Sequence, residues 1–317
     1  MGMRTLQTKL VCCLGLASLA GPALADEGGV SFWLPGQYGS LAAVPGTPGW
    51  ALPLVYYHGY ASADANVLTQ RGNRIAAGVD ARTNMLFAFP TYTFAQPVLG
   101  GQAALAAGAA FGHVKVEADA TLTGRGGAVL SGAESDSRNG FSDVFVTGSL
   151  KWNHGVHNTL AYLSTNLPVG TYNPNRLANL GLNHWSIDGG GGYTYLDPKK
   201  GHEFSAVAGV TRNFENDDTN YRNGTSAHLD WAASQFVSKE THVGVAGYCY
   251  HQLTGDKGAG ARLGSHKSRI AGIGPQVGHS FDVGGQQWYV NLKGYYEFNE
   301  KNRPKGWNLW VSLAIPL

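Results

Sequence analysis

The chain closes on Trp307-Asn308-Leu309-Trp310-Val311-Ser312-Leu313-Ala314-Ile315-Pro316-Leu317, in which the odd-numbered residues are all large and apolar. Successive side chains of a β-strand point to opposite faces, so this stretch would carry one wholly apolar face. Such a face requires apolar surroundings. The pattern is typical of the closing strand of an outer-membrane β-barrel.

The N-terminal region has the parts of a secretory signal peptide. Arg4 and Lys9 form a short basic region, residues 10–20 are apolar or small, and Ala23-Leu24-Ala25 is a cleavage site of the A-x-A type. The apolar run is shorter than the roughly 20 residues that a membrane-spanning helix needs. We therefore predict a cleaved signal peptide over 1–25 and export. An N-terminal membrane anchor is the alternative.

Composition and charge argue against several kinds of partner. Loss of residues 1–25 removes Arg4 and Lys9 from the 23 basic side chains, which leaves 21 basic and 21 acidic ones. Without a basic surplus, we expect no nucleic-acid partner. Of the three cysteines, only Cys249 remains, which argues against a disulfide framework and a cysteine zinc site. We expect no cofactor and no metal.

Segments with β-type alternation recur along the rest of the chain, and the connections between them alternate between short and long. The expected strands are 50–62, 83–95, 101–117, 141–152, 156–168, 183–195, 201–214, 224–236, 240–253, 269–281, 286–299 and 306–317. The long polar connections are 63–82, 118–140, 169–182, 215–223 and 254–268, with a shorter one at 300–305.

This alternation of connection lengths favours a membrane barrel over a soluble sandwich. In a barrel with both termini in the periplasm, short turns lie on the periplasmic side and long loops lie outside the cell. We predict an all-β fold, a transmembrane antiparallel barrel of about 12 strands over residues 50–317. The last strand is expected to pair with the first, near residues 50–62, and to close the ring.

The alternation also predicts which side chains line the lumen. A charge facing lipid at the bilayer midplane costs about 2–4 kcal/mol, so polar residues should point inward. The lumen candidates for solute selection are Asp143, Lys151, Asp188, His228, Asp230, Lys293 and Glu297. For each of them, a structural network of charges across strands is the alternative role.

Residues 26–49 do not alternate, and they combine aromatic residues with Pro-Gly turns. The candidates for burial inside the barrel are Phe32, Trp33, Pro35, Tyr38 and Leu41. Exposed, these side chains would form an adhesive apolar patch. A barrel of this size is wider than one that side chains alone fill. We predict that the segment plugs the lumen, with a periplasmic flap or partner site as the alternative.

Several motifs resemble a known family of exported proteins. They are Gly28–Gly36 with Ser40–Pro45, Gly140-Phe141-Ser142-Asp143, and Leu167-Pro168-Val169-Gly170-Thr171-Tyr172, in which Val169 replaces an expected threonine. This combination resembles the outer-membrane transporter family named for the meta-pathway of phenol degradation, over essentially the whole mature chain. The resemblance implies a Gram-negative outer-membrane channel for passive uptake of small hydrophobic or aromatic compounds.

Two other functions remain as alternatives to transport. His184, Ser186 and Asp188 share one strand face, as in a nucleophilic hydrolase, but that face is expected to point away from lipid substrates. We therefore predict no enzymatic activity. Charged loop tips such as Asp217 would suit a structural or adhesive barrel. The expected partners are outer-membrane lipid, lipopolysaccharide, the barrel-insertion machinery and a small hydrophobic solute.

Overall fold

The structure is a computed structural model that describes residues 27, 30–68, 74–123, 127–261 and 264–317. The predicted signal peptide over 1–25 lies outside these residues. The strands are β1 (Gly49–Leu68), β2 (Arg74–Ala88), β3 (Thr91–Thr93), β4 (Gln102–Thr123), β5 (Val129–Phe141), β6 (Val144–His154), β7 (His157–Leu167), β8 (Ser186–Asp197), β9 (His202–Asn213), β10 (Ser226–Phe236), β11 (Thr241–Gln252), β12 (Arg269–Val283), β13 (Gln286–Lys301) and β14 (Lys305–Pro316). Within these described ranges, no helix is long and apolar enough to cross a membrane.

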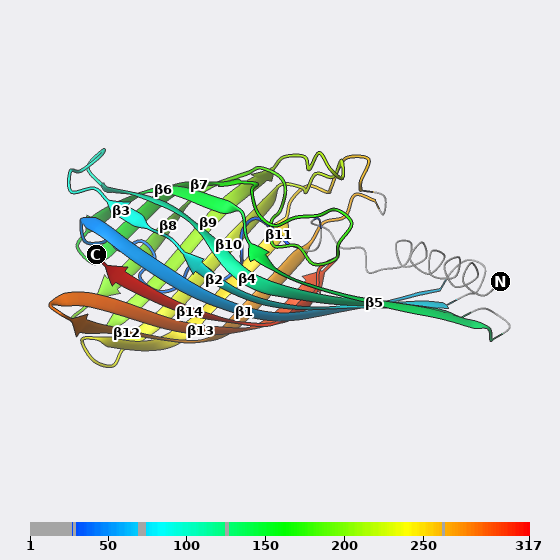
Figure 1. The fold of residues 1–317 in the computed structure, drawn as a ribbon. Coiled ribbons are helices and arrows are strands. Elements are labelled where there is room, and N and C mark those ends of the chain that lie inside the picture. Colours follow the sequence, from blue (N-terminus) through cyan, green and yellow to red (C-terminus); the bar gives the residue numbers. More distant parts are fainter. Residues whose placement is uncertain (1–26, 28–29, 69–73, 124–126, 262–263) are drawn as a thin grey trace.

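Twelve of these strands form a closed antiparallel ring (Figure 1). The ring runs through β1, β2, β4 and then β6 to β14 in order, and β14 pairs back with β1. That closing ladder extends from Ala51 with Pro316 to Ser62 with Lys305. The predicted pairing of the last strand with the first is therefore confirmed. The other two strands, β3 and β5, are additional to the ring and both pair with β4.

The ring buries polar side chains and exposes apolar ones. On β10, Asp230 is 1% exposed, whereas its neighbour Leu229 is 37% exposed. On β13, Lys293 is 2% exposed and Tyr296 is 67% exposed. Soluble proteins show the opposite distribution, with charged residues outside and large apolar residues inside. An apolar outer surface combined with a polar interior is typical of a barrel that lipid surrounds.

Strands β1, β2, β4 and β5 continue past one end of the ring as a projecting sheet (Figure 1). The pairing of β1 with β14 ends at Ser62, but β1 and β2 remain paired as far as Leu68. The second half of β4, from Phe111 to the end of the strand, pairs with β5 instead of β6. The prediction of polar loops over 63–82 and 118–140 is therefore wrong, because much of both ranges is strand.

The physical reason for this error is that the apolar face of the projecting sheet is built mainly from small side chains. On β4, Val116 and Ala118 lie on that face, while Lys115 and Glu117 form an exposed ion pair on the other. Because charged residues alternate with alanine and valine, both stretches resemble polar loops although the period of two is present. The single strand predicted over 83–95 is also divided, because Pro90, which has no N–H to donate, separates β2 from β3.

Candidate functional site in the barrel lumen

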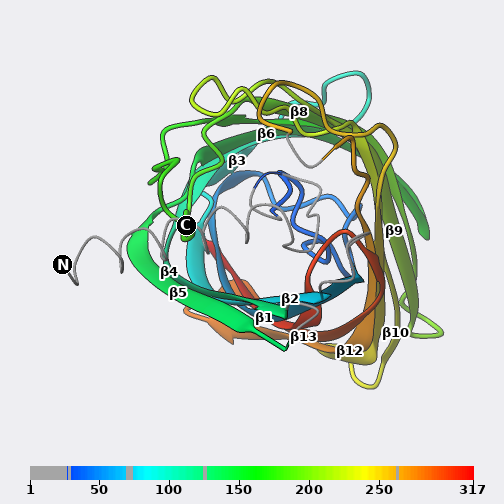
Figure 2. The ribbon, with the colours of Figure 1, turned by 90° about the vertical axis from the view of Figure 1, so that its right-hand side faces the viewer.

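Residues 30–48, here called the N-terminal segment, lie within the ring of strands (Figure 2). A Pro-Gly turn brings this segment close to the barrel wall. Gly36 has a φ of +89°, and a Cβ atom at that position would lie 2.9 Å from the ring of Tyr295 and 3.0 Å from that of Tyr248. Glycine therefore serves two purposes here, since it accepts the left-handed backbone and leaves space for two tyrosines.

Two buried and oppositely charged side chains hold the backbone of residues 36–38. Lys293 Nζ donates hydrogen bonds to the carbonyl oxygens of Gly36 (2.6 Å), Gln37 (3.0 Å) and Tyr38 (3.0 Å). Asp230 accepts hydrogen bonds from the backbone N–H groups of Gly36 (3.0 Å) and Tyr38 (3.1 Å). Because both side chains project from the wall, they fix the turn of the segment to β13 and β10.

A second group of wall residues holds the next turn of the segment. Glu203 accepts hydrogen bonds from Ser40 Oγ (2.5 Å) and from the backbone N–H of Leu41 (2.9 Å). Gln276 also donates to Ser40 Oγ, which lies 2.8 Å from Ser234 Oγ. Sequence reasoning missed Glu203 as an inward residue. Its neighbour Phe204, which is large, apolar and exposed, was the available signal that Glu203 faces the lumen.

Trp33 of the segment stacks on a buried His–Asp pair. The rings of Trp33 and His228 lie 3.5 Å apart between centroids and are nearly parallel, at 14°. Nε2 of His228 is 2.9 Å from Oδ2 of Asp188. The other carboxylate oxygen, Oδ1, accepts a hydrogen bond from the hydroxyl of Tyr162. A Cβ at Gly209 would lie 2.2 Å from that hydroxyl, so the glycine leaves room for this network.

The lumen candidates thus fall into two groups. Lys151, Asp188, His228, Asp230 and Lys293 all contact the N-terminal segment or a residue that stacks on it. The other two do not. Asp143 accepts hydrogen bonds from Gly170 N (3.0 Å) and Leu182 N (3.1 Å), and these two bonds anchor the long connection after β7. Glu297 accepts a hydrogen bond from the hydroxyl of Tyr248 (2.6 Å).

That long connection also carries charges above the lumen. Arg176 pairs with Asp136 of the projecting β5, and this hydrogen-bonded guanidinium holds the pKa of Asp136 well below its usual range. Burial, together with the nearby carboxylate of Glu27, raises the pKa of Tyr172 to about 12. The connection therefore remains attached to the projecting sheet at neutral pH.

The five candidates for burial within the barrel all lie in the segment, but they differ in depth. Phe32 and Trp33 are 6% and 3% exposed, while Pro35, Tyr38 and Leu41 are partly buried. The ring of Phe32 lies 5.7 Å from that of Phe145 on β6. Phe32 therefore packs against β6, whereas its neighbour Trp33 packs against His228 of β10.

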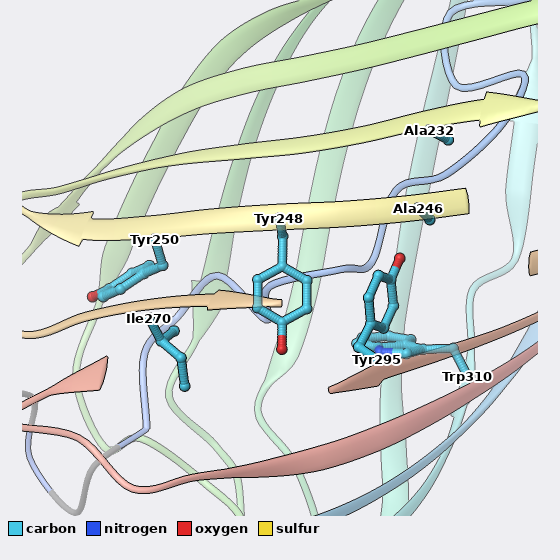
Figure 3. Packing of buried hydrophobic residues seen from close by; sticks show 7 residues of the cluster. All are labelled: Ala232, Ala246, Tyr248, Tyr250, Ile270, Tyr295 and Trp310. Carbon is cyan, nitrogen blue, oxygen red and sulfur yellow. The ribbon is translucent and has the colours of Figure 1, made fainter. Parts of the chain in front are cut away.

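The wall beside Gly36 carries a cluster of aromatic side chains (Figure 3). Tyr248 and Tyr295 project from neighbouring parts of the wall, and their ring centroids lie 4.9 Å apart. Trp310 belongs to the same cluster and contacts Tyr57 edge to face, at 4.8 Å. These buried rings therefore form an apolar wall against which the turn at Gly36 packs.

Two cavities of about 400 Å³ each lie beside the segment. The turn-side cavity is lined by Phe32, Trp33, Leu34, Gln37, Tyr38, Pro53, Val55, Phe87, Phe89, Thr91, Phe145, Thr147, Lys151, Tyr162, Ser164 and Trp310. The loop-side cavity is bounded by residues nearer the long connections, including Tyr57, Met85, Tyr172, Arg176, Glu297 and Arg303. Leu34 lines both cavities, so it stands where they meet.

The trio His184, Ser186 and Asp188 is not arranged as a catalytic triad. Ser186 Oγ lies 3.3 Å from His184 Nδ1 and donates to Asn213 Oδ1 at 2.8 Å, but Asp188 pairs with His228 instead of orienting His184. All three side chains are nearly inaccessible, at 2% exposure or less. Across the described ranges, no group of three or more His, Cys, Asp or Glu side chains could hold a metal ion.

Comparisons with known proteins agree with this architecture. Residues 63–313 match the sequence profile of a family described as "Putative MetA-pathway of phenol degradation". A crystal structure of an outer membrane channel from Pseudomonas putida F1 has a similar fold, with a TM-score of 0.60 at 16% identity, covering 90% of this chain and 100% of that one. The transport unit of the autotransporter AIDA-I from Escherichia coli superposes less closely, with a TM-score of 0.44 at 13% identity, covering 85% and 90% of the two chains. No curated protein sequence matches the chain.

Proposed function

Because the chain belongs to the MetA-pathway phenol-degradation family, we propose that it forms an outer-membrane channel for passive uptake of small hydrophobic or aromatic compounds. The apolar outer surface of the ring supports a place in lipid. The similarity in fold to an outer membrane channel supports the same conclusion. The lumen, with its ring faces and few charges, suits a small amphipathic solute.

In this proposal the N-terminal segment is a fixed plug that narrows the lumen without sealing it. Its backbone is bound by Glu203 on β9, Asp230 on β10 and Lys293 on β13, all on one side of the ring, so it stays in place while solutes pass. The passage runs beside the segment, along the wall formed by β1, β2 and β6. Five of the seven lumen candidates act mainly by holding this plug, and one of them, Lys151, also reaches the passage itself.

The observation that carries the proposal is the pair of cavities that meet at Leu34. Pockets of about 300–1,000 Å³ with mostly apolar walls and few polar groups are typical of small-molecule sites. Two such spaces in line within a membrane barrel form a route that one side chain interrupts. A purely structural or adhesive barrel has no need of this arrangement.

An outer-membrane channel function also implies where each part of the chain lies relative to the membrane. We infer that residues 1–25 are a cleaved signal peptide, that residues 26–49 form the plug, and that residues 50–317 form the barrel. Both termini then lie in the periplasm, and the projecting sheet reaches outward from the cell. Its partners are outer-membrane lipid, lipopolysaccharide and, during assembly, the barrel-insertion machinery.

Purified protein in planar bilayers and liposomes tests the channel directly. We expect discrete ion-current steps, and swelling of liposomes in benzenesulfonate, an aromatic anion that crosses lipid slowly. Protein that has been heated before reconstitution is the control, because it has lost the barrel. Absence of both signals, even after deletion of residues 30–45, would contradict transport and favour a structural role.

A further inference from the structure

Lys151 differs from Lys293, the other lysine that binds the backbone of the segment. Its Nζ donates one hydrogen bond, to the carbonyl oxygen of Val44 at 3.0 Å, although a lysine ammonium has three donors. Lys293 uses all three donors, and His228 is paired with Asp188. Among the described residues, no carboxylate lies within ion-pair distance of Lys151. Its charge therefore lacks a counter-ion.

Trp33 lines the same cavity as Lys151. The indole Nε1–H of Trp33 is buried and has no hydrogen-bond acceptor in the described part of the chain. Leaving a buried donor unpaired costs free energy, and a charged donor costs more than a neutral one. The ammonium of Lys151, with one acceptor for three donors, is therefore matched by a molecule that brings acceptor oxygens.

The remaining walls of that cavity define the rest of such a molecule. Ring faces and edges of Phe87, Phe89, Phe145 and Trp310 surround the space. Aromatic side chains favour a planar ring in stacked or edge-to-face contact. A small, planar, apolar body with acceptor oxygens at one end satisfies both kinds of wall.

We propose that the turn-side cavity is a binding site for a small aromatic carboxylate. Lys151 receives the carboxylate, and the ring of the solute packs among the phenylalanines and Trp310. This inference rests on the proposed channel function and narrows its substrate class to aromatic acids. Binding of the anion supplies the counter-ion that Lys151 lacks, so the charged solute is preferred over a neutral one of equal size.

The test is titration of the purified full-length barrel with benzoate and with benzyl alcohol at pH 7.5, followed by tryptophan fluorescence. Trp33 and Trp310 line the cavity and report occupancy. We expect benzoate to bind at least about tenfold more tightly than the alcohol, since a hydrogen bond to a charged group contributes about 1.5–3 kcal/mol. Lys151→Met should abolish this preference by weakening benzoate binding at least about tenfold more than alcohol binding, and Lys151→Arg should retain it. Lys305→Met, which removes an exposed lysine, is the control.

The outcomes separate the two proposals. Equal binding of benzoate and benzyl alcohol by the unaltered protein overturns the aromatic-acid site, and so does a Lys151→Met variant that still prefers benzoate. In both cases the channel stands if ion current and benzenesulfonate swelling are present. Loss of both transport signals overturns the channel proposal itself. Heat-modifiable mobility equal to that of the unaltered protein shows that the Lys151→Met variant is folded.

Discussion

Replacing Lys293 by methionine is expected to raise the single-channel conductance several-fold. The ammonium holds three carbonyl oxygens of the turn at Gly36, and each buried acceptor left unpaired costs about 1–3 kcal/mol. The substitution also removes a positive charge that is bound to the same turn as the buried carboxylate of Asp230, which makes that carboxylate more costly to bury. Together these penalties exceed what the turn can absorb, so residues 33–38 leave the wall and the lumen widens.

The same substitution should also make the channel more selective for cations, because the lumen loses one positive charge and keeps Asp230. Reversal potentials in a salt gradient measure this shift. Lys305→Met is the matched control, since Lys305 is an exposed lysine whose ammonium pairs only with Glu300 at the barrel end. Conductance and selectivity equal to those of the unaltered protein would mean that Lys293 does not hold the plug.

The size of the side chain at position 34 should control the rate of passage, so that a smaller residue raises the rate and a larger one lowers it. Leu34→Ala is expected to raise benzenesulfonate swelling rates several-fold, because it removes the side chain that separates the two cavities. Leu34→Trp should reduce the rate by at least about tenfold, because the larger ring fills the junction and cannot repack without strain. Both variants should leave the heat-modifiable mobility of the folded barrel unchanged, since Leu34 lies on the segment and not in the wall.

Leu292 offers a matched pair of controls for the changes at Leu34. It lies on β13 with its side chain 41% exposed on the outer surface, so Leu292→Ala and Leu292→Trp change volume without touching the passage. Swelling rates that respond to both leucines alike would indicate an effect on barrel stability. Swelling rates that change with neither Leu34→Ala nor Leu34→Trp would mean that the route lies elsewhere in the lumen.

Much of the barrel follows from local sequence patterns. Alternation along β8, β10 and β13 depends only on which face meets lipid, so residues such as Asp188 and Asp230 could be assigned to the lumen in advance. The projecting sheet was missed for a different reason, because its apolar face consists mainly of alanine and valine set between charged residues, as in Val116-Glu117-Ala118-Asp119-Ala120 on β4. Such small side chains give only a weak signal of alternation, so the stretch resembles a polar loop.

The candidate site could be predicted only in part, for a different reason. The aromatic and Pro-Gly content of residues 26–49 indicated a buried segment, but its seat depends on contacts between residues more than 150 positions apart, such as Lys293 with Gly36 and Glu203 with Leu41. Periodicity reports the local environment of a strand and says nothing about such pairs. The different roles of Lys151 and Lys293 likewise appear only in the assembled lumen.

A reversible cross-link between Ser40 and Ser234 tests most directly whether solutes pass beside a fixed plug. Their hydroxyl oxygens lie 2.8 Å apart, so cysteines at both positions are within reach of a disulfide. Cys249, which is exposed and unpaired, is first replaced by serine. We predict that the disulfide forms and that ion current and benzenesulfonate swelling remain within about twofold of the reduced protein. A cross-linked barrel that is closed and that opens on reduction would contradict the account, as would failure of the two cysteines to pair.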